Sequence, residues 1–261
     1  MFYYNLKSAP TQYLSTMSKI TRIKNFIYDC LFPIFCLNCG TFIKNEEGRY
    51  LCPICLKTIP LHSSLFCPIC LKRIGLLKKC SHSDKPSSLD FLAAATDYEN
   101  PLIQKLIHLY KYQFIKDIRY TLSDIVISYW EKIWPDLKTQ FGESLVIPIP
   151  LSRQRFKERG FNQSEEIAKI FADHFQLEIN NQILVRLRNT PPQAKIENYN
   201  DRQLNLQNAF GLQNALPSGK KNIILVDDVF TSGATMQEAA KVLKQNGAKR
   251  IIGLTIAKSR K

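Results

Sequence analysis

Residues 226–235 read Val-Asp-Asp-Val-Phe-Thr-Ser-Gly-Ala-Thr, and this stretch decides the fold. The apolar run at 223–226 is typical of a buried strand, and residues 234–245 have the composition of a helix. A strand, a tight loop and a helix N-terminus in this order form an anion-binding site, because free backbone N–H groups meet the positive end of the helix dipole there. We therefore predict an α/β protein with a parallel sheet, in which this loop binds a phosphate group.

Two acidic side chains, Asp227 and Asp228, precede the loop. Carboxylates repel a bare phosphate, so we expect them to bind the hydroxyl groups of a sugar that carries the phosphate, or a magnesium ion beside it. An ordinary capped strand–turn–helix is the simplest alternative. A Walker B strand is a second alternative, but its nearest partner loop, at 214–221, lacks the first glycine and the final Ser or Thr. The backbone and hydroxyl groups that would bind the phosphate belong to Thr231, Ser232, Gly233, Ala234 and Thr235.

A second strand–loop–helix segment precedes this one in the chain. Residues 145–150 form a short apolar strand, and residues 151–164 form a loop with four basic residues and a glycine. We expect the following helix to run from Glu165, with Asn162 or Ser164 as its cap. This is a second strand–loop–helix crevice, and its four basic residues favour anion binding over a merely solvated basic loop.

The two segments resemble the binding loops of the type I phosphoribosyltransferases, which bind phosphoribosyl pyrophosphate (PRPP). By this resemblance Asp227 and Asp228 would bind the ribose 2′- and 3′-hydroxyls, and residues 231–235 would bind the 5′-phosphate. The Arg-Gly-Phe sequence resembles the pyrophosphate loop of these enzymes. Arg159 would donate a forked pair of hydrogen bonds to the diphosphate, and Gly160 would let the backbone approach it. The resemblance also allows a magnesium ion bound together with PRPP.

Residues 185–210 lie between the two binding loops. Two prolines and few large apolar residues in their first part predict a mobile loop. Their position matches the hood that closes over the substrate in phosphoribosyltransferases. By that match, Arg188 and Arg202 could approach the pyrophosphate.

The eight cysteines all fall between residues 30 and 80, and six of them form Cys-x-x-Cys pairs. Such pairs direct two sulfur atoms at one point, which is typical of structural zinc sites. Disulfides and a redox-active pair are alternatives, and the pairs could also interleave. One zinc ion is favoured and two are allowed. The first predicted set is Cys36, Cys39, Cys52 and Cys55, and the second is Cys67, Cys70, Cys80 and His82.

The net charge of +14 is concentrated in the first third of the chain. Residues 1–85 contain twelve basic and four acidic residues, an excess of eight positive charges. Such an excess favours polyanionic partners, although a merely soluble basic protein would show it too. Zinc thiolate sites would lower the excess to about five, because each deprotonated cysteine adds a negative charge. Nucleic acid binding is therefore indicated, but not by charge alone.

The chain divides into three predicted parts. Residues 1–30 would be an N-terminal extension and helix, residues 31–85 the zinc-binding module, and residues 90–261 the phosphoribosyltransferase-like domain. The chain has no run of about 18 apolar residues and no signal peptide, so we expect a cytoplasmic protein without a membrane span. Within the last part we expect strands at 91–98 and 251–257, a helix over 117–133, and a helix from Pro101 with Ile103, Leu106, Ile107, Tyr110 and Phe114 on its buried side. His62 is expected to be a loop residue.

Three motifs in one chain resemble the ComF competence family, also called GntX-like. They are the cysteine pairs, Pro-Leu-x8-Gly-Phe-Asn-Gln from residue 150, and Thr-x2-Gln-x8-Arg-x2-Asn-Leu-x2-Ala-Phe from residue 190, beside the loop at 226–235. The resemblance covers about residues 20–261. It implies a cytoplasmic role in natural transformation, in which incoming single-stranded DNA is handled with a helicase-like ATPase and single-strand handling proteins.

Only four residues, 258–261, follow the last predicted strand, so the loop that would recognise a nucleobase is short and basic. We therefore expect binding of incoming single-stranded DNA through the basic zinc module and the PRPP-type pocket. An active phosphoribosyltransferase of nucleobase salvage is one alternative. An adaptor that binds partner proteins through the zinc module is another.

Overall fold

The computed structural model describes residues 31, 33–44, 48–75, 78, 80, 87–134, 143–189, 206–219 and 221–259. The predicted extension at 1–30, His82 and Arg202 lie outside the described residues.

A seven-stranded sheet forms the centre of the molecule, in the order β4-β3-β5-β11-β10-β6-β7. Its middle consists of β5 (Phe91–Asp97), β11 (Arg250–Lys258), β10 (Asn222–Phe230) and β6 (Ser144–Pro148), all parallel. The short β7 (Glu178–Ile179) continues the parallel part. β10 pairs with β11 and β6 on its two sides, and its apolar residues 223–226 are buried on both faces of the sheet, as is typical of a central parallel strand. The predicted parallel α/β fold is confirmed.

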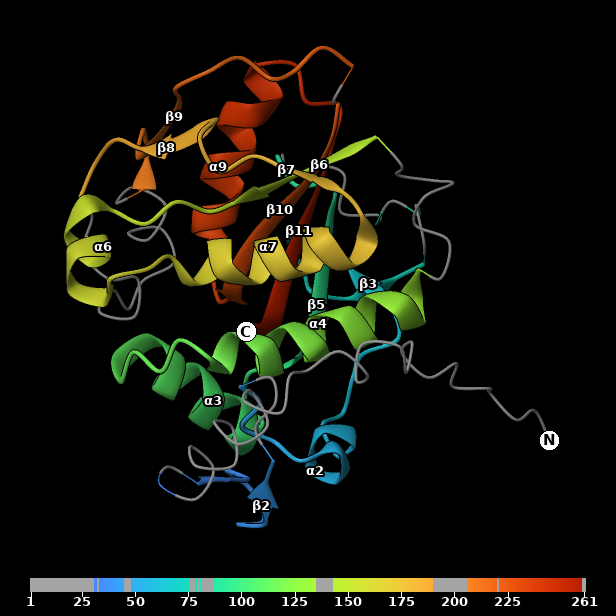
Figure 1. The fold of residues 1–261 in the computed structure, drawn as a ribbon. Coiled ribbons are helices and arrows are strands. Elements are labelled where there is room, and N and C mark those ends of the chain that lie inside the picture. Colours follow the sequence, from blue (N-terminus) through green and yellow to red (C-terminus); the bar gives the residue numbers. More distant parts are fainter. Residues whose placement is uncertain are drawn as a thin grey trace.

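Helices cover both faces of the sheet (Figure 1). One face packs against α3 (Pro101–Tyr112), α4 (Ile118–Ile133) and α7 (Gln163–Phe175), and the other against α9 (Ala234–Gln245). Alternation along β10 explains this division, since neighbouring strand residues point to opposite faces. Ile224 and Val226 join the first core, whereas Ile223 and Leu225 join the second.

The helix predicted from Pro101 is confirmed, with one correction. Asn100 caps α3 by accepting hydrogen bonds from the N–H groups of Leu102 and Ile103. The buried side of α3 consists of Ile103, Leu106, Ile107 and Tyr110, as predicted. Phe114 does not belong to it. The helix ends at Tyr112, and Phe114 has a φ of 57° and a side chain that is 46% exposed.

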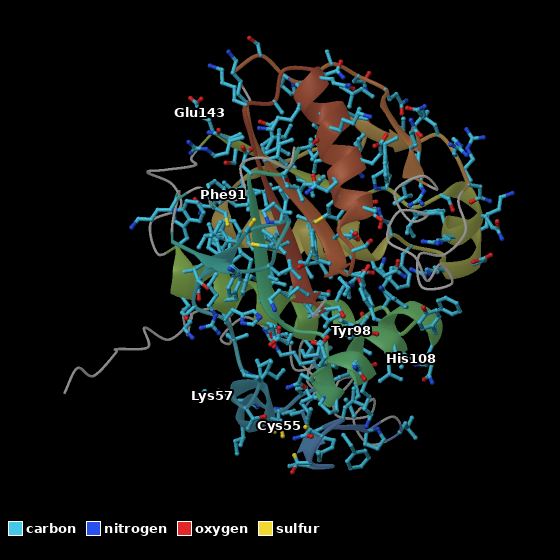
Figure 2. The ribbon with its side chains drawn as sticks, turned by 180° about the vertical axis from the view of Figure 1, so that it is seen from behind. Cys55, Lys57, Phe91, Tyr98, His108 and Glu143 are labelled. Atoms are coloured by element: carbon cyan, nitrogen blue, oxygen red, sulfur yellow. The ribbon has the colours of Figure 1, made fainter. Side chains whose placement is uncertain are left out.

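The first cysteine-rich segment packs beside α3 and α4. It contains the hairpin of β1 (Ile34–Phe35) and β2 (Phe42–Ile43), followed by α2 (Pro53–Lys57). The Arg49 guanidinium lies 2.6 Å from the carboxylate of Asp124 in α4. Lys105 of α3 donates to the carbonyl of Leu37. In Figure 2 the chain runs along β5 from Phe91 toward Tyr98, which follows the strand. Cys55 and Lys57 lie at the end of the molecule toward which it runs.

The second cysteine-rich segment joins the main sheet. Its hairpin, β3 (Leu65–Phe66) and β4 (Arg73–Ile74), adds to the edge of the sheet because Phe66 pairs antiparallel with Leu92 of β5. His62, expected to be a loop residue, lies just before this hairpin in no helix or strand. Its side chain is buried against the Phe66 ring, and Nε2 is 3.4 Å from the Asp97 carboxylate. Burial lowers the pKa of His62.

Candidate phosphate- and sugar-binding site

The acidic pair lies within β10, near its C-terminal end. The strand continues to Phe230, so both acids belong to the strand itself. Asp227 Oδ1 accepts hydrogen bonds from the Ser164 hydroxyl at 2.9 Å and from the Asp228 N–H at 2.9 Å. Asp228 Oδ1 lies 2.8 Å from the Lys111 ammonium. Each acid is thus bound by a partner from a different helix.

The loop after β10 has the geometry that the sequence predicts for anion binding. It leads from Phe230 into α9, whose N-cap is Gly233 with a φ of 79°. A Cβ atom at this position would lie 2.3 Å from the Phe230 ring, so only glycine fits. Thr231 and Thr235 line the adjoining cleft. Ser232, Gly233 and Ala234 are buried in the turn, where the Ser232 hydroxyl accepts from the Ala234 N–H at 3.4 Å.

The segment at 151–164 is not a loop throughout, as we had expected. Residues Arg153–Arg159 form the short helix α6, capped by the Ser152 hydroxyl and ended by Gly160, which has a φ of 75°. A serine N-cap and a left-handed glycine after the last turn are standard helix boundaries, and they outweigh the polar composition between them. The next helix, α7, begins at Gln163 rather than Glu165, and Asn162 is its cap.

A cleft of about 310 Å³ lies between the two predicted loops. It brings together five predicted site residues: Asp227, Asp228, Thr231, Thr235 and Arg159. The other predicted residues, Ser232, Gly233, Ala234 and Gly160, belong to the adjacent turns but are not among its lining residues. The predicted site residues did not include six further polar lining residues, which are Lys111, Tyr112, Arg155, Glu158, Ser164 and Arg186.

Three arginines form the basic side of the cleft. Burial lowers the pKa of Arg155, and Arg159 beside it lowers the pKa further. Burial lowers the pKa of Arg186 to about 10, with Arg155 as the next cause. Like charges therefore lie close together in a partly desolvated space, a state that an anionic ligand would relieve. The Arg159 guanidinium is also near the Tyr112 ring, at 5.8 Å from its centre.

Asp227 has a perturbed pKa. Its pKa is raised to about 6, first because burial disfavours the carboxylate and then because Asp228 lies beside it. Lys111 and the hydrogen bonds from Asp228 and Ser164 act in the opposite direction. Such a carboxylate readily accepts hydrogen bonds from hydroxyl groups, since these bonds favour its ionised form.

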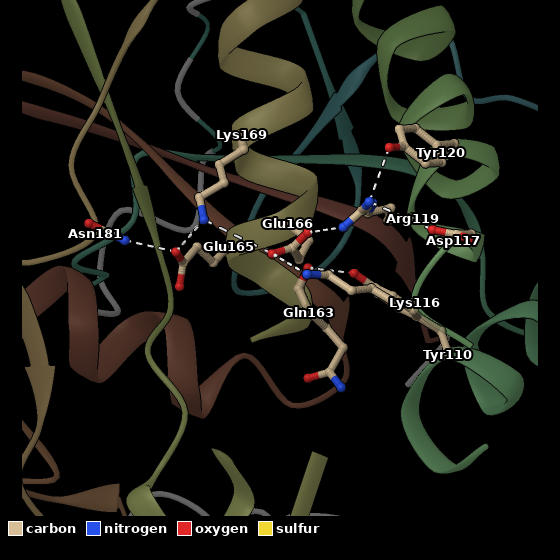
Figure 3. Close-up of polar contacts among 10 residues, drawn as sticks. All are labelled: Tyr110, Lys116, Asp117, Arg119, Tyr120, Gln163, Glu165, Glu166, Lys169 and Asn181. Carbon is tan, nitrogen blue, oxygen red and sulfur yellow. Dashed lines mark hydrogen bonds and ion pairs between the residues drawn. The ribbon is translucent and has the colours of Figure 1, made fainter. Parts of the chain in front are cut away.

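The first turn of α7 is fixed by a polar network (Figure 3). Glu166 forms ion pairs with Arg119, in the first turn of α4, at 2.5 Å and with Lys116, just before α4, at 3.4 Å. The Tyr110 hydroxyl donates to the Gln163 carbonyl at 3.2 Å. These contacts hold Gln163, whose Oε1 accepts from Arg159 at 3.0 Å. The network therefore positions Arg159, which lines the cleft, although the residues of the network do not line it themselves.

Of the hood predicted over 185–210, the structure describes residues 185–189 and 206–210. Its ends form a two-stranded sheet of β8 (Leu184–Arg186) and β9 (Phe210–Leu212), so the loop expectation is wrong there. The Arg188 guanidinium donates to the Gln207 carbonyl at 2.8 Å and does not line the cleft. Arg186 of β8 lines it instead.

Two cysteine groups have the geometry of metal sites. The sulfur atoms of Cys36, Cys39, Cys52 and Cys55 all lie within 4.8 Å of one another, and so do those of Cys67, Cys70 and Cys80. This grouping excludes the interleaved pairing, and the seven described cysteines are free of disulfides. In the first group, backbone N–H groups of Cys52 and Cys55 point at sulfur atoms at 3.4 Å, which suits thiolate ligands.

A model of the phosphoribosyl transferase domain matches residues 164–261, which include the acidic pair and the loop after it. The chain therefore contains a phosphoribosyl transferase domain with the parallel sheet and the cleft described above. Among curated proteins, the DNA utilization protein YhgH of Salmonella typhimurium is 31% identical over 76% of this chain and 86% of its own length. The chain belongs to the ComF competence family.

Two further relatives carry competence names. Competence protein ComFC of Bacillus subtilis is 26% identical over 86% of this chain and 84% of its own length. Competence protein F of Haemophilus influenzae is 34% identical over 41% of this chain and 46% of its own length. Across the described part of the chain, no helix combines the length and apolar character that a membrane span requires.

Proposed function

We propose that this protein handles single-stranded DNA during natural transformation, in the cytoplasm, and that its cleft binds a phosphorylated pentose. One observation carries the proposal: Asp227 and Asp228 lie in one cleft with Thr231 and Thr235 of the phosphate loop, opposite arginine side chains. Carboxylates can accept hydrogen bonds from hydroxyl groups, and the donors beside them can bind a phosphate group. A sugar phosphate carries both kinds of group. The names of the relatives, DNA utilization and competence, support the biological setting.

Different residues of the cleft would bind different parts of the ligand. Asp227 and Asp228 would accept hydrogen bonds from ribose hydroxyls, and residues 231–235 would bind the 5′-phosphate at the N-terminus of α9. Arg155, Arg159 and Arg186 would bind a diphosphate, as in PRPP, or the next phosphodiester of a strand.

The surroundings of the cleft support single-stranded nucleic acid as a ligand. Tyr112 lines the cleft with 57% of its surface exposed, and Phe156 on the outer side of α6 is 50% exposed. Exposed aromatic rings among cationic side chains stack on unpaired bases without regard to sequence. The basic cysteine module would add phosphate contacts, with zinc bound by Cys36, Cys39, Cys52 and Cys55 and a second ion by the Cys67 group. A helicase-like ATPase and single-strand handling proteins would be its partners.

A titration of labelled single-stranded DNA, with and without PRPP, tests the proposal. We expect binding that weakens with salt, and competition by PRPP if both ligands use the cleft. An Arg159→Ala variant should bind both ligands more weakly, whereas Lys241→Ala, which removes an exposed lysine of α9, should not. Failure of both PRPP and oligonucleotide to bind would refute the proposed function.

An active phosphoribosyltransferase remains the second candidate, because the acidic pair and the basic side of the cleft are both present. The end of β11 offers little for a base, since Lys258 is buried and its ammonium lies 2.5 Å from Asp97. Release of pyrophosphate from PRPP with any common nucleobase, lost in Asp227→Ala, would establish the enzyme. Its complete absence would leave binding alone.

A further inference from the structure

Lys111, one of the cationic residues of the cleft, forms a direct ion pair with an acid. It lies in the last turn of α3 and reaches Asp228 of β10, where its Nζ is 2.8 Å from Oδ1. The two side chains are only 19% and 14% exposed. The pair is therefore largely shielded from water, and its attraction is stronger than that of a surface ion pair.

The carboxylates of the cleft do not suit a magnesium ion held by the protein. Magnesium requires oxygen ligands in near-octahedral geometry and is usually bound by one or two carboxylates besides phosphates and water. Here Asp228 is paired with Lys111, and Asp227 accepts two hydrogen bonds. Glu158, the third acid, accepts from Gln154 at 2.9 Å. Among the described residues, only the two cysteine groups bring three or more ligating side chains within 4.8 Å.

The cleft contains its own positive charge in place of a metal. Lys111 and the three arginines, at 155, 159 and 186, face three carboxylates, so the balance is positive before any ligand binds. A magnesium ion placed beside Asp228 would compete with the ammonium of Lys111 for the same oxygen and would be repelled by it. A magnesium ion usually offsets the charge of a bound diphosphate. Here Lys111 and the three arginines of the cleft would offset that charge instead.

We propose that Lys111 replaces the divalent cation at this site, so that a pentose diphosphate such as PRPP binds without metal. An ammonium group has three donors. Lys111 can therefore hold Asp228 and also donate to an oxygen of the diphosphate. The inference rests on the proposed sugar-phosphate binding and specifies its charge requirement.

Calorimetric titration of PRPP in buffer depleted of divalent cations by a chelating resin, then with magnesium added, tests the inference. Resin treatment of the buffer is preferred to adding EDTA, which would also remove zinc from the cysteine groups. Wild-type protein should bind PRPP in the depleted buffer, with a Kd that magnesium changes by less than about threefold. Binding that appears only with magnesium would overturn the inference and leave the proposed function intact. No binding in either buffer would overturn both.

Substitution of Lys111 provides the second arm. Lys111→Met should weaken PRPP binding in depleted buffer by about tenfold or more, and magnesium should restore part of the loss because Asp228 becomes available to it. Lys111→Arg should bind PRPP without metal, and Lys241→Met on the exposed side of α9 should behave as wild type. If Lys111→Met binds as wild type does in depleted buffer, Lys111 is not the substitute cation. Circular dichroism and zinc content would verify that each variant is folded.

Discussion

The two sides of the cleft are built in different ways. The acidic side, Asp227 to Thr235, is one continuous segment, held by parallel pairing of β10 with β6 and β11. The basic side comes from three separate segments: Lys111 of α3, Arg155 and Arg159 of α6, and Arg186 of β8. The proposed positions of the hydroxyl and phosphate groups on the acidic side follow from local backbone geometry. The charges of the basic side depend on how distant elements pack, so the two sides should respond differently to mutation.

The largest effect is expected from Cys55→Ser, which removes a ligand of the first cysteine group. Loss of a structural zinc ligand typically unfolds the module it supports. This module packs on α3 and α4 through Lys105 and Asp124, so the basic side should be affected more than the acidic side. We expect a loss of about one zinc per chain by metal analysis and oligonucleotide binding weakened by tenfold or more. Ile54→Ala, an exposed neighbour in α2, is the control and should keep its zinc.

Gly233→Ala should damage the acidic side alone. The alanine Cβ would clash with the Phe230 ring in addition to the strain of a φ of 79°, so the free energy of unfolding should fall by about 3 kcal/mol. Gly219→Ala is a matched control, because its φ is 85° but nothing lies within 4 Å of the added atom. It should cost about 1 kcal/mol. Equal losses in urea unfolding of the two variants would show that the Phe230 contact is unimportant.

Arg155→Met, on the basic side, should weaken ligand binding without lowering the stability of the protein. Its removal relieves the repulsion that lowers the pKa of Arg186, so the Tm should not fall. The same change removes a forked donor for phosphate, and PRPP and oligonucleotide should bind about tenfold more weakly. Arg188→Met, outside the cleft, is the control and should leave both ligands bound as in wild type. A large fall in Tm for Arg155→Met would mean that Arg155 is mainly structural.

A pH dependence of stability is also expected on the acidic side. The pKa of Asp227 is raised from 3.8 to about 6 in the folded protein, so its contribution to stability is full below pH 3.8 and is lost as the pH rises through 6. Asp227→Asn removes this penalty. The variant should gain on the order of 2 kcal/mol relative to wild type between about pH 4 and pH 7, measured by urea unfolding at each pH. A stability difference that is constant with pH would contradict the raised pKa.

The sequence predicted the acidic side of the cleft and missed most of the basic side, for a physical reason. Residues 226–235 carry a strand, a turn and a helix start in consecutive positions, so their geometry is local. Lys111 is separated from Asp228 by more than a hundred residues, and no local pattern connects them. Arg186, rather than the predicted Arg188, lines the cleft, because β8 ends at Arg186 and the Arg188 guanidinium instead donates to the Gln207 carbonyl. The helix at 153–159 was readable from Ser152 and Gly160, but its polar composition indicated a loop.

The start of α7 has one more consequence for ligand size. Gln163 contacts Arg159 on the basic side, and the next residue, Ser164, contacts Asp227 on the acidic side. In the proposed binding mode, these two consecutive residues connect the carboxylate that would bind hydroxyl groups with an arginine that would bind the diphosphate. We therefore expect the cleft to select ligands by the length between sugar and diphosphate, rather than by the identity of a base.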